Sequence, residues 1–418
     1  VLNAAMYAQK FRDAEMAKLA VDILISLVAT QNSPAVHTMC TDAAFNLTLE
    51  HLSDVHDKHV VKYVVRTIAI VSGIRELVPY ASDSEVVAIV SRVVTQWDQF
   101  DDELADDLAK YLSNICYPST REAMRTLVDE DELQVAIMQL MDKVKVYPSA
   151  TSHLCTALQN LLLHPDNCRD LCGTVLPTLM ECMDRNYDLA AARAVFNISC
   201  VAICVAPLME SRVHILMQSL FTKNTDTEAR NVYLSTVLQL MRVDQCIKEL
   251  YLNGILDALH AAITNKETES LWPNVINIVL YLVHCNDIDF TEQEMQKVVT
   301  LLNIVCTENT SEEIVGQAAV VIAYLSLSLS EVSTVAHLLK SLLDLSDREV
   351  VEESVSVILY NFSCSRKGID LLLSEKIYIN MMVRLMRNGA ADVKQNIAKT
   401  LRTLCTEEKA LELITEVP

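Results

Sequence analysis

Residues 188–200 read DLAAARAVFNISC, and this stretch decides the fold. Apolar side chains return at Leu189, Ala192 and Val195, the spacing of residues that share one face of a helix. The stretch contains no glycine or proline, and it carries Asn197 in an apolar frame near its end. The pattern predicts a helix that buries one side and places a polar residue close to its last turn.

The same helix ending recurs along the chain. FNL at 45–47, LSNI at 112–115, LQNL at 158–161 and LYNF at 359–362 repeat it, and degenerate copies keep only the apolar frame. From residue 114 onward the polar position falls at 114, 160, 197, 239, 281, 324, 361 and 403, with spacings of 46, 37, 42, 42, 43, 37 and 42 residues. A period near 40 fits armadillo or HEAT repeats and excludes the shorter tetratricopeptide and ankyrin units.

Each interval has internal structure as well. After Asn160 the pattern predicts a short helix at Asn167–Cys172, a break at Gly173 and a second helix at Leu176–Met183. A later interval has helices at Val243–Leu250 and Ile255–Ile263, separated by the turn Asn253-Gly254. One such unit cannot bury its apolar faces alone, so neighbouring units are expected to stack.

The first hundred residues depart from the period, and so does a short segment near 290. We expect residues Asn286–Phe290 to replace a first helix by a loop. In the first hundred residues the pattern predicts helices at Asp13–Val28, Ala35–Glu50, His59–Val71 and Ser84–Trp97.

A short helix, a glycine turn, a middle helix and a long third helix ending in Leu-x-Asn-Leu resemble the armadillo repeat. The resemblance implies an all-α, right-handed α-solenoid (superhelix) of about nine to ten armadillo-type repeats. We expect irregular capping repeats in residues 1–100 and regular repeats in residues 101–418, joined in one continuous solenoid.

In such arrays the third helices line a concave groove, and the Asn near each helix end bonds the backbone of an extended peptide. A carboxamide suits this role because it offers a donor and an acceptor. The alternative is that these side chains bond neighbouring repeats and hold the stack together. Because Gln239, Tyr281 and Tyr324 interrupt the asparagines, we do not expect a peptide groove along the whole array. The ladder that the resemblance implies consists of Asn46, Asn114, Asn160, Asn197, Gln239 and Asn361.

Nuclear-import adaptors of this family also carry a Trp one turn before each Asn. None of the corresponding positions here is aromatic, which argues against ordinary recognition of nuclear-localisation peptides. These positions are Asp42, Lys110, Thr156, Arg193 and Val357.

The chain is strongly acidic, with a formal net charge of −21 and a pI near 4.9. Phosphate backbones repel such a surface, so we expect no nucleic-acid partner. One acidic cluster is dense enough to attract a basic partner, although carboxylates also cap and stabilise helix starts. The cluster consists of Asp98, Asp101, Asp102, Glu103, Asp106 and Asp107.

Nothing in the sequence pairs a nucleophile with a base, and no phosphate-loop or nucleophile-elbow motif occurs. We expect no enzyme activity, no cofactor and no metal site. The grouped residues His51, His56 and His59 span a predicted helix junction and are expected to be solvated. The cysteines are expected to be buried packing residues in a reducing compartment, among them Cys155, Cys168, Cys172, Cys200, Cys204, Cys306 and Cys405.

No stretch reaches the roughly 18 apolar residues that a membrane-spanning helix needs. The chain begins in mid-pattern at Val1, so we expect it to be part of a longer chain or complex. The sequence predicts a cytoplasmic scaffold that binds protein partners, with basic or extended segments among the candidate ligands. The alternative is a structural component of a cytoskeletal or ciliary assembly, docked by its edges and ends.

Overall fold

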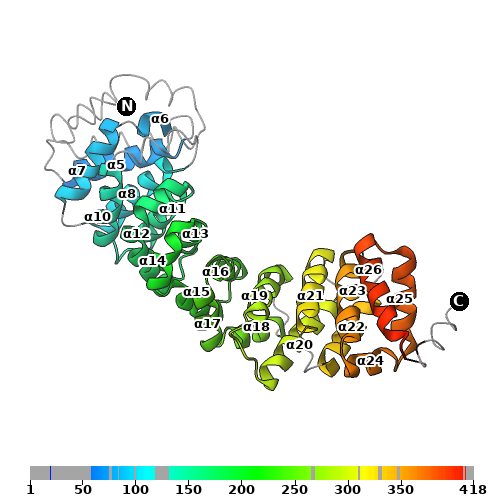
Figure 1. Cartoon of the computed structure of the whole chain (residues 1–418). Helices are drawn as coiled ribbons and strands as arrows, with labels where there is room; N and C mark the ends of the chain where they lie inside the picture. Colours follow the sequence, from blue (N-terminus) through cyan, green and yellow to red (C-terminus); the bar gives the residue numbers. More distant parts are fainter. Residues whose placement is uncertain are drawn as a thin grey trace. The chain divides into compact units, whose positions relative to one another are not determined.

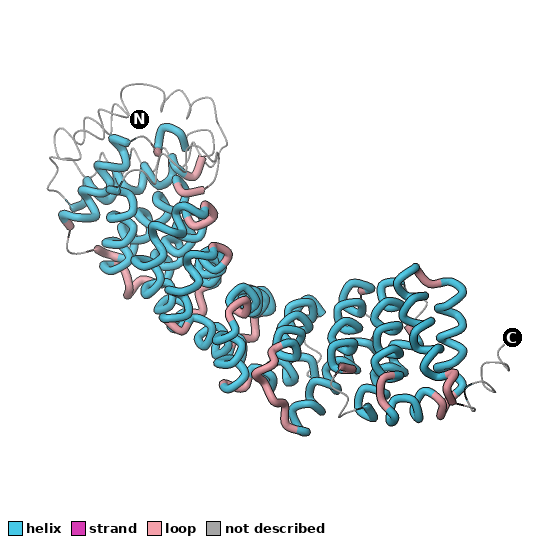
Figure 2. The backbone as a smooth tube through the Cα atoms, viewed as in Figure 1, coloured by secondary structure: helices cyan, strands magenta, loops and turns pink. Residues whose placement is uncertain are grey.

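The computed structural model describes a chain built from helices. The described residues are 19, 58–74, 78–82, 84–97, 100–117, 131–264, 269–308, 311–327, 332–345, 349–407 and 410, and they contain no strand. Short turns and loops join the helices (Figure 2). The chain forms two compact units, Val1–Ser211 and Arg212–Pro418, hereafter the first and second units.

The described helices of the first unit are the following, labelled as in Figure 1. They are α5 (Lys58–Ser72), α6 (Val78–Ala81), α7 (Ser84–Gln96), α8 (Asp102–Ile115), α10 (Asp131–Lys143), α11 (Pro148–Leu161), α12 (Pro165–Asn186), α13 (Leu189–Ser199), η3 (Ala202–Cys204) and α14 (Val205–Glu210).

The second unit is also built from helices. Its described helices are α15 (Val213–Lys223), α16 (Thr227–Leu240), α17 (Asp244–Leu252), α18 (Ile255–Thr264), η4 (Glu269–Leu271), α19 (Trp272–His284), α20 (Glu292–Thr307), α21 (Glu312–Leu325), α22 (Val332–Asp344), α23 (Glu349–Ser363), α24 (Arg366–Leu372), α25 (Lys376–Asn388) and α26 (Ala391–Leu404).

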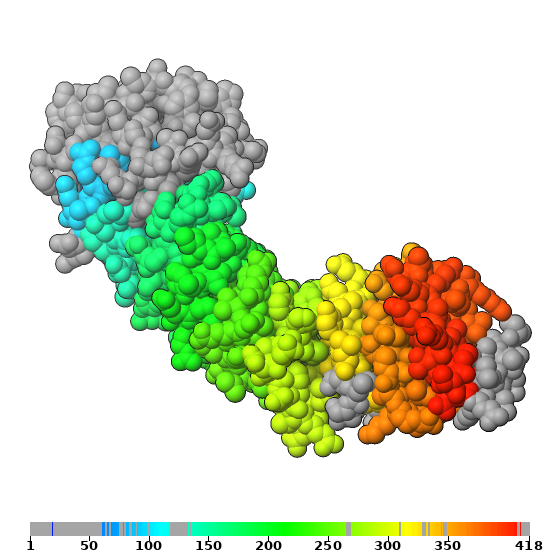
Figure 3. Space-filling model, in the orientation of Figure 1, coloured from blue at the N-terminus to red at the C-terminus, as the bar shows by residue number. Residues whose placement is uncertain are grey.

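Within each unit the third helices of successive repeats pack side by side in chain order. In the first unit α5, α8, α11 and α13 form this row, and in the second unit α16, α19, α21, α23 and α26 do (Figure 1). A second layer packs behind it, in which α18, α20 and α22 follow one another in the second unit. The buried core is mostly aliphatic, with a few large aromatic side chains such as Trp272 and Phe221. Seen from outside, neighbouring helices of the described parts form a continuous surface (Figure 3).

Several third helices begin at a residue whose side chain satisfies the free N–H groups of the first turn. Asp188 accepts a hydrogen bond from Ala191 N at 2.9 Å, and Asp226 accepts one from Ala229 N at 2.8 Å. Ser311 does the same for Ile314 N at 3.4 Å. Loss of such a cap typically costs about 1 kcal/mol, so these residues fix where the helices start.

The structure corrects the prediction of two helices around Gly173, because residues 165–186 form one continuous helix, α12. Gly173 is exposed and a Cβ there would meet no atom within 4 Å, so glycine is not needed for a turn. It lies four residues before Pro177, whose ring crowds the carbonyl at that position and cannot donate to it. The carbonyl that Pro177 leaves without a helical donor is therefore that of Gly173, on the exposed side of the helix.

Other sequence predictions for the repeats are confirmed. Gly254 has φ +79°, the left-handed conformation that the turn between α17 and α18 requires. The predicted helices at 59–71 and 84–97 correspond to α5 and α7. The predicted helices at 13–28 and 35–50 lie outside the described residues.

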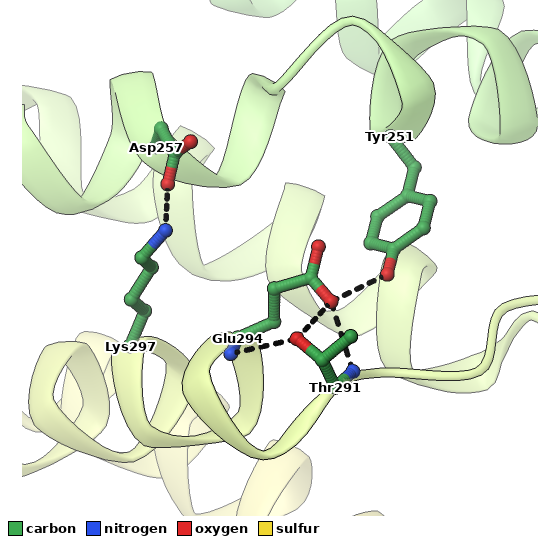
Figure 4. A network of polar contacts seen from close by, with 5 residues as sticks. All are labelled: Tyr251, Asp257, Thr291, Glu294 and Lys297. Carbon is green, nitrogen blue, oxygen red and sulfur yellow. Dashed lines mark hydrogen bonds and ion pairs between the residues drawn. The ribbon is translucent and has the colours of Figure 1, made fainter.

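A loop replaces the first helix between α19 and α20, as predicted, and polar contacts fix it at its end (Figure 4). Thr291 and Glu294 form a capping box in which Glu294 N donates to Thr291 Oγ1 and Thr291 N donates to Glu294 Oε2. The hydroxyl of Tyr251, from α17, donates to the same Glu294 oxygen at 2.8 Å. Lys297 forms an ion pair with Asp257 of α18. These contacts tie α20 to the preceding repeat without a first helix.

Among the described residues, no single helix has both the length and the apolar composition to span a membrane. One bent pair, Leu189–Ser199 with Ala202–Glu210, reaches these limits only in combination and is bent by 109°.

Candidate protein-binding face

The third helices of the second unit expose apolar side chains that the core does not use. Tyr281 of α19 and Tyr324 of α21 stand at corresponding positions of their repeats, where the asparagine frame is interrupted. Tyr324 is 39% exposed, and Leu327, in the turn after α21, is 60% exposed. We use the name third-helix face for a set of exposed and half-exposed side chains on α19, α21 and α23, together with Leu327 in the turn after α21. The set consists of Tyr281, His284, Val320, Tyr324, Leu327, Glu353 and Val357.

A hollow of about 380 Å³ opens on this face between α21 and α23. Val320, Ala323, Tyr324 and Leu327 line it from α21 and the turn that follows. The facing wall belongs to α23 and consists of Glu353, Ser354 and Val357. The walls are thus mostly aliphatic and aromatic, with one carboxylate at the edge.

The charges on these helices are one-sided. The sequences of α19, α21 and α23 contain no Lys or Arg. Carboxylates stand in the first turns of α21 and α23, where the positive end of a helix favours them, and Glu353 adds another beyond the first turn. Basic side chains return on α26, where Lys399 lies over the ring of Tyr360 at 5.7 Å from the centroid. The hollow therefore lies in an acidic part of the row.

Three of the ladder asparagines bond the preceding repeat. Asn114 Nδ2 donates to Ser72 Oγ at 3.1 Å, Asn197 Nδ2 donates to the Gln159 carbonyl at 3.1 Å, and Asn361 Nδ2 donates to Ser326 Oγ at 2.8 Å. In each case the acceptor lies near the end of the previous third helix. The amide hydrogens of these side chains thus link the stack, which is the alternative that the sequence left open.

The remaining ladder residues differ in exposure. Asn160 is buried and Gln239 is half-buried, whereas Asn46 lies outside the described residues. Binding of a partner by any ladder residue stays a prediction. Sequence reasoning missed two further cross-repeat bonds, from Asn274 to Ser235 Oγ at 3.1 Å and from Asn396 to Ser356 Oγ at 3.2 Å. Each donor lies seven residues before the frame position of its helix, 281 or 403, so the frame that defined the ladder does not include it.

The acidic cluster of the first unit is largely committed to internal contacts. Asp101 caps α8 by accepting from Leu104 N at 3.0 Å, and Lys62 of α5 forms ion pairs with Asp101 and Glu103. The hydrogen bond from Lys62 lowers the pKa of the Glu103 carboxyl below its ordinary value. Asp102 is exposed, and Asp98 lies outside the described residues. These contacts cap the start of α8 and pair its carboxylates with Lys62. Capping of a helix start was the alternative to binding of a basic partner.

The last two members of the cluster lie deeper on α8. Burial alone would raise the pKa of Asp106, but hydrogen bonds from Lys110 and Ser149 outweigh it and lower the pKa. Burial raises the pKa of Asp107 to about 6, against the opposing charge of Arg66. Neither carboxylate is presented as part of a uniform acidic surface, and binding of a partner here stays a prediction.

Two of the cysteines predicted to be buried are exposed. Cys200 and Cys405 cap the C-terminal ends of α13 and α26, where the chain leaves the packed layer, whereas Cys155 and Cys306 are buried. Although Cys200 and Cys204 are four residues apart, a spacing that would put them on one face of a continuous helix, the chain turns between α13 and η3 and separates them.

The buried thiols of Cys168 and Cys172 on α12 are poor nucleophiles. Burial raises the pKa of Cys168 and of Cys172 to about 12. No group of three or more His, Cys, Asp or Glu within the described part of the chain is arranged to hold a metal ion. His51 and His56 lie outside that part.

Comparison with known proteins settles the fold. No protein-family model matches the chain, and no curated protein matches its sequence. A solved chain from work on a phosphorylation switch that controls the interaction between cadherin and beta-catenin superposes with a TM-score of 0.66 at 14% identity. That match covers 96% of this chain and 79% of the other. The chain has an armadillo-like helical-repeat fold.

Engineered proteins also resemble this armadillo-like chain. One superposes with a TM-score of 0.64 at 17% identity, covering 88% of this chain and 90% of the engineered one. A designed armadillo repeat protein matches 55% of this chain and 99% of its own, with a TM-score of 0.46 at 17% identity. The rows of packed helices and the two matches with TM-scores of 0.66 and 0.64 confirm the predicted all-α solenoid of armadillo-type repeats.

Proposed function

We propose that the chain is a non-enzymatic scaffold that binds protein partners through the third-helix face of its second unit. One observation carries this proposal: Val320, Tyr324 and Leu327 remain exposed around a hollow on α21 and the turn after it, and Tyr281 is exposed on the preceding third helix, α19. Exposed apolar side chains that cluster on one surface are typical of protein contact sites. Isolated exposed side chains would carry no such meaning.

The cross-repeat hydrogen bonds support a binding face that depends on apolar contacts rather than on the asparagine ladder. Asn361, next to the hollow on α23, is buried and donates to Ser326 Oγ. One of its amide hydrogens is therefore engaged inside the stack. The aromatic residues that interrupt the ladder, Tyr281 and Tyr324, are the ones that present surface to a partner.

The alternative function is a structural role in a cytoskeletal or ciliary assembly that docks by edges and ends. Exposed apolar residues outside the third helices favour it, including Tyr187 between α12 and α13 and Leu252 at the end of α17. A cytoplasmic location is part of both proposals. The net charge of −21 supports a protein partner over a nucleic acid.

Site-specific photo-crosslinking distinguishes the two functions. p-Benzoylphenylalanine replaces Tyr281, Tyr324 or Tyr187 singly, in cells that express the chain, and adducts are identified after denaturing purification. Tyr324 and Tyr187 form a matched pair, since they are 39% and 44% exposed. If partners bind at the third-helix face, we expect defined protein adducts from positions 281 and 324 and none from position 187. Adducts from position 187 alone would favour docking by edges.

A further inference from the structure

The hollow between α21 and α23 has a shape that suits one or two large side chains. The two helices approach closely at Gly316, where a Cβ would lie 3.5 Å from the Cβ of Val350. One turn further on, at Val320 and Ser354, they leave about 380 Å³ open. This volume lies at the lower end of the range for small-ligand pockets, about 300–1,000 Å³. The hollow is therefore a socket for an anchor residue rather than a trough for a whole helix.

The walls of the socket select an apolar anchor. Val320 and Tyr324 are exposed along one wall, and Val357 is half-buried on the other. Leu327 stands at the rim and is 60% exposed. The packed core already buries the other face of α21, through Ala318, Val321 and Ile322. The apolar residues in the socket therefore do not contribute to the packed core. They stay in contact with water until a ligand covers them.

The carboxylate of Glu353, which lines the socket, favours a positively charged residue beside the anchor residue of a bound segment. Glu353 is exposed, and within the described residues its carboxylate makes no ion pair. No Lys or Arg occurs in α19, α21 or α23 to neutralise it. A cationic side chain on a bound segment would complement this carboxylate, and an acidic one would be repelled.

We propose that this socket docks a partner protein through a short segment with one large aliphatic or aromatic side chain and a Lys or Arg within two residues of it. The apolar side chain fills the socket and the base pairs with Glu353. A second copy of this chain is a poorer occupant, because two molecules of net charge −21 repel each other. This inference rests on the proposed function and deepens it by naming the chemistry of the partner segment.

The probe is a random library of 12-residue peptides displayed on phage, selected against the purified full chain. The expected result is a consensus of one large apolar residue with Lys or Arg within two positions. A synthetic peptide of that consensus is then measured by fluorescence anisotropy, with variants that replace the apolar residue by Gly or the base by Glu. Each replacement should weaken binding at least about ten-fold, and added NaCl should weaken binding of the parent peptide.

Matched variants of the chain locate the peptide. Leu327→Ser should weaken binding several-fold, whereas Leu252→Ser, at a residue 80% exposed on α17, should leave it unchanged. Glu353→Gln should weaken binding and reduce its salt dependence, while Glu292→Gln, an exposed acid at the start of α20, should do neither. Circular dichroism melting confirms that all four variants fold.

The outcomes separate failure of this inference from failure of the proposed function. Peptides that are acidic or lack a base overturn the inference, as does a basic peptide that Leu327→Ser and Glu353→Gln bind normally. In either case crosslinks from positions 281 and 324 would still support the scaffold. A library that yields no binder overturns the socket, and sedimentation showing a dimer that Leu327→Ser dissolves would assign it to a second copy.

Discussion

The ring of His284, the last residue of α19, packs edge-on against the ring of Tyr324 on α21. Their centroids lie 5.2 Å apart and the planes meet at 78°. The contact joins two consecutive repeats, and Tyr324 also lines the hollow between α21 and α23. His284 on α19 thus contacts Tyr324, a side chain that lines one wall of the socket between α21 and α23.

Removing the His284 ring should loosen this wall with only a small loss of stability. Edge-to-face aromatic pairs contribute about 0.5–1.5 kcal/mol, and exposure places this pair at the lower end. His284→Ala should therefore lower the free energy of unfolding of the full chain by about 0.5 kcal/mol in urea titrations. His284→Phe keeps an aromatic edge and should retain most of the free energy of unfolding that His284→Ala loses. Equal losses in the two variants would show that the ring contact is not stabilising.

The bond from Asn361 to Ser326 should contribute to the stability of the stack. Asn361 is buried and its Nδ2 lies 2.8 Å from Ser326 Oγ, which itself donates to the Ala323 carbonyl. Asn361→Ala should destabilise the chain by about 1–2 kcal/mol. A double-mutant cycle with Ser326→Ala should show a coupling energy of about 1 kcal/mol. Additive losses would mean that the two side chains do not support each other.

Two glycines should respond in opposite ways to the same substitution. A Cβ at Gly368 would overlap the backbone carbonyl of Phe362, whereas one at Gly173 would meet nothing within 4 Å. Gly368→Ala should therefore destabilise the chain by more than about 2 kcal/mol, in the manner of overpacked cores. Gly173→Ala should be neutral or stabilising by up to about 1 kcal/mol. Thermal melts of the two variants check both signs.

Asp107 should make the first unit more stable in mild acid. Its folded-state pKa of about 6 lies above the ordinary value of 3.8, so the folded chain binds the proton more tightly than the unfolded chain. The contribution of Asp107 should thus increase as pH falls through 6 and level off below 4. Because the side chain is partly solvated, we expect an effect of only about 1 kcal/mol. Asp107→Asn should remove it.

The test is the difference between wild type and Asp107→Asn in urea midpoint, measured from pH 4 to pH 7.5. The variant should be the more stable of the two at pH 7.5, with the difference shrinking toward pH 4. A difference that does not change with pH would contradict the raised pKa.

Most of the repeat architecture could be predicted from the sequence. The apolar spacing within residues 188–200 and the recurring frame are local signals, and α13 and the row of third helices follow from them. The continuity of α12 was missed because Gly173 predicted a break. The carbonyl that Pro177 leaves without its helical donor is that of Gly173, on the exposed side of the helix, so one continuous helix accommodates both residues.

The candidate site was harder to predict because partners across repeats are not local. The frame identified Asn114, Asn197 and Asn361 but could not show that Ser72, Gln159 and Ser326 receive their hydrogen bonds. The hollow had one sequence signal that could have found it. α21 is apolar on two faces, and a helix with one packed face does not need the second.

Hydroxyl-radical footprinting is the most direct test of partner binding at the third-helix face. It uses a partner protein that the photo-crosslinking experiment has identified. Oxidation rates of individual side chains in the full chain are compared with and without that partner, purified separately. We predict slower oxidation of Tyr281, Tyr324 and Leu327 in the presence of the partner, with Tyr187 and Leu252 unchanged. Protection of Tyr187 and Leu252 while Tyr324 and Leu327 keep their rates would contradict a binding site on the third-helix face.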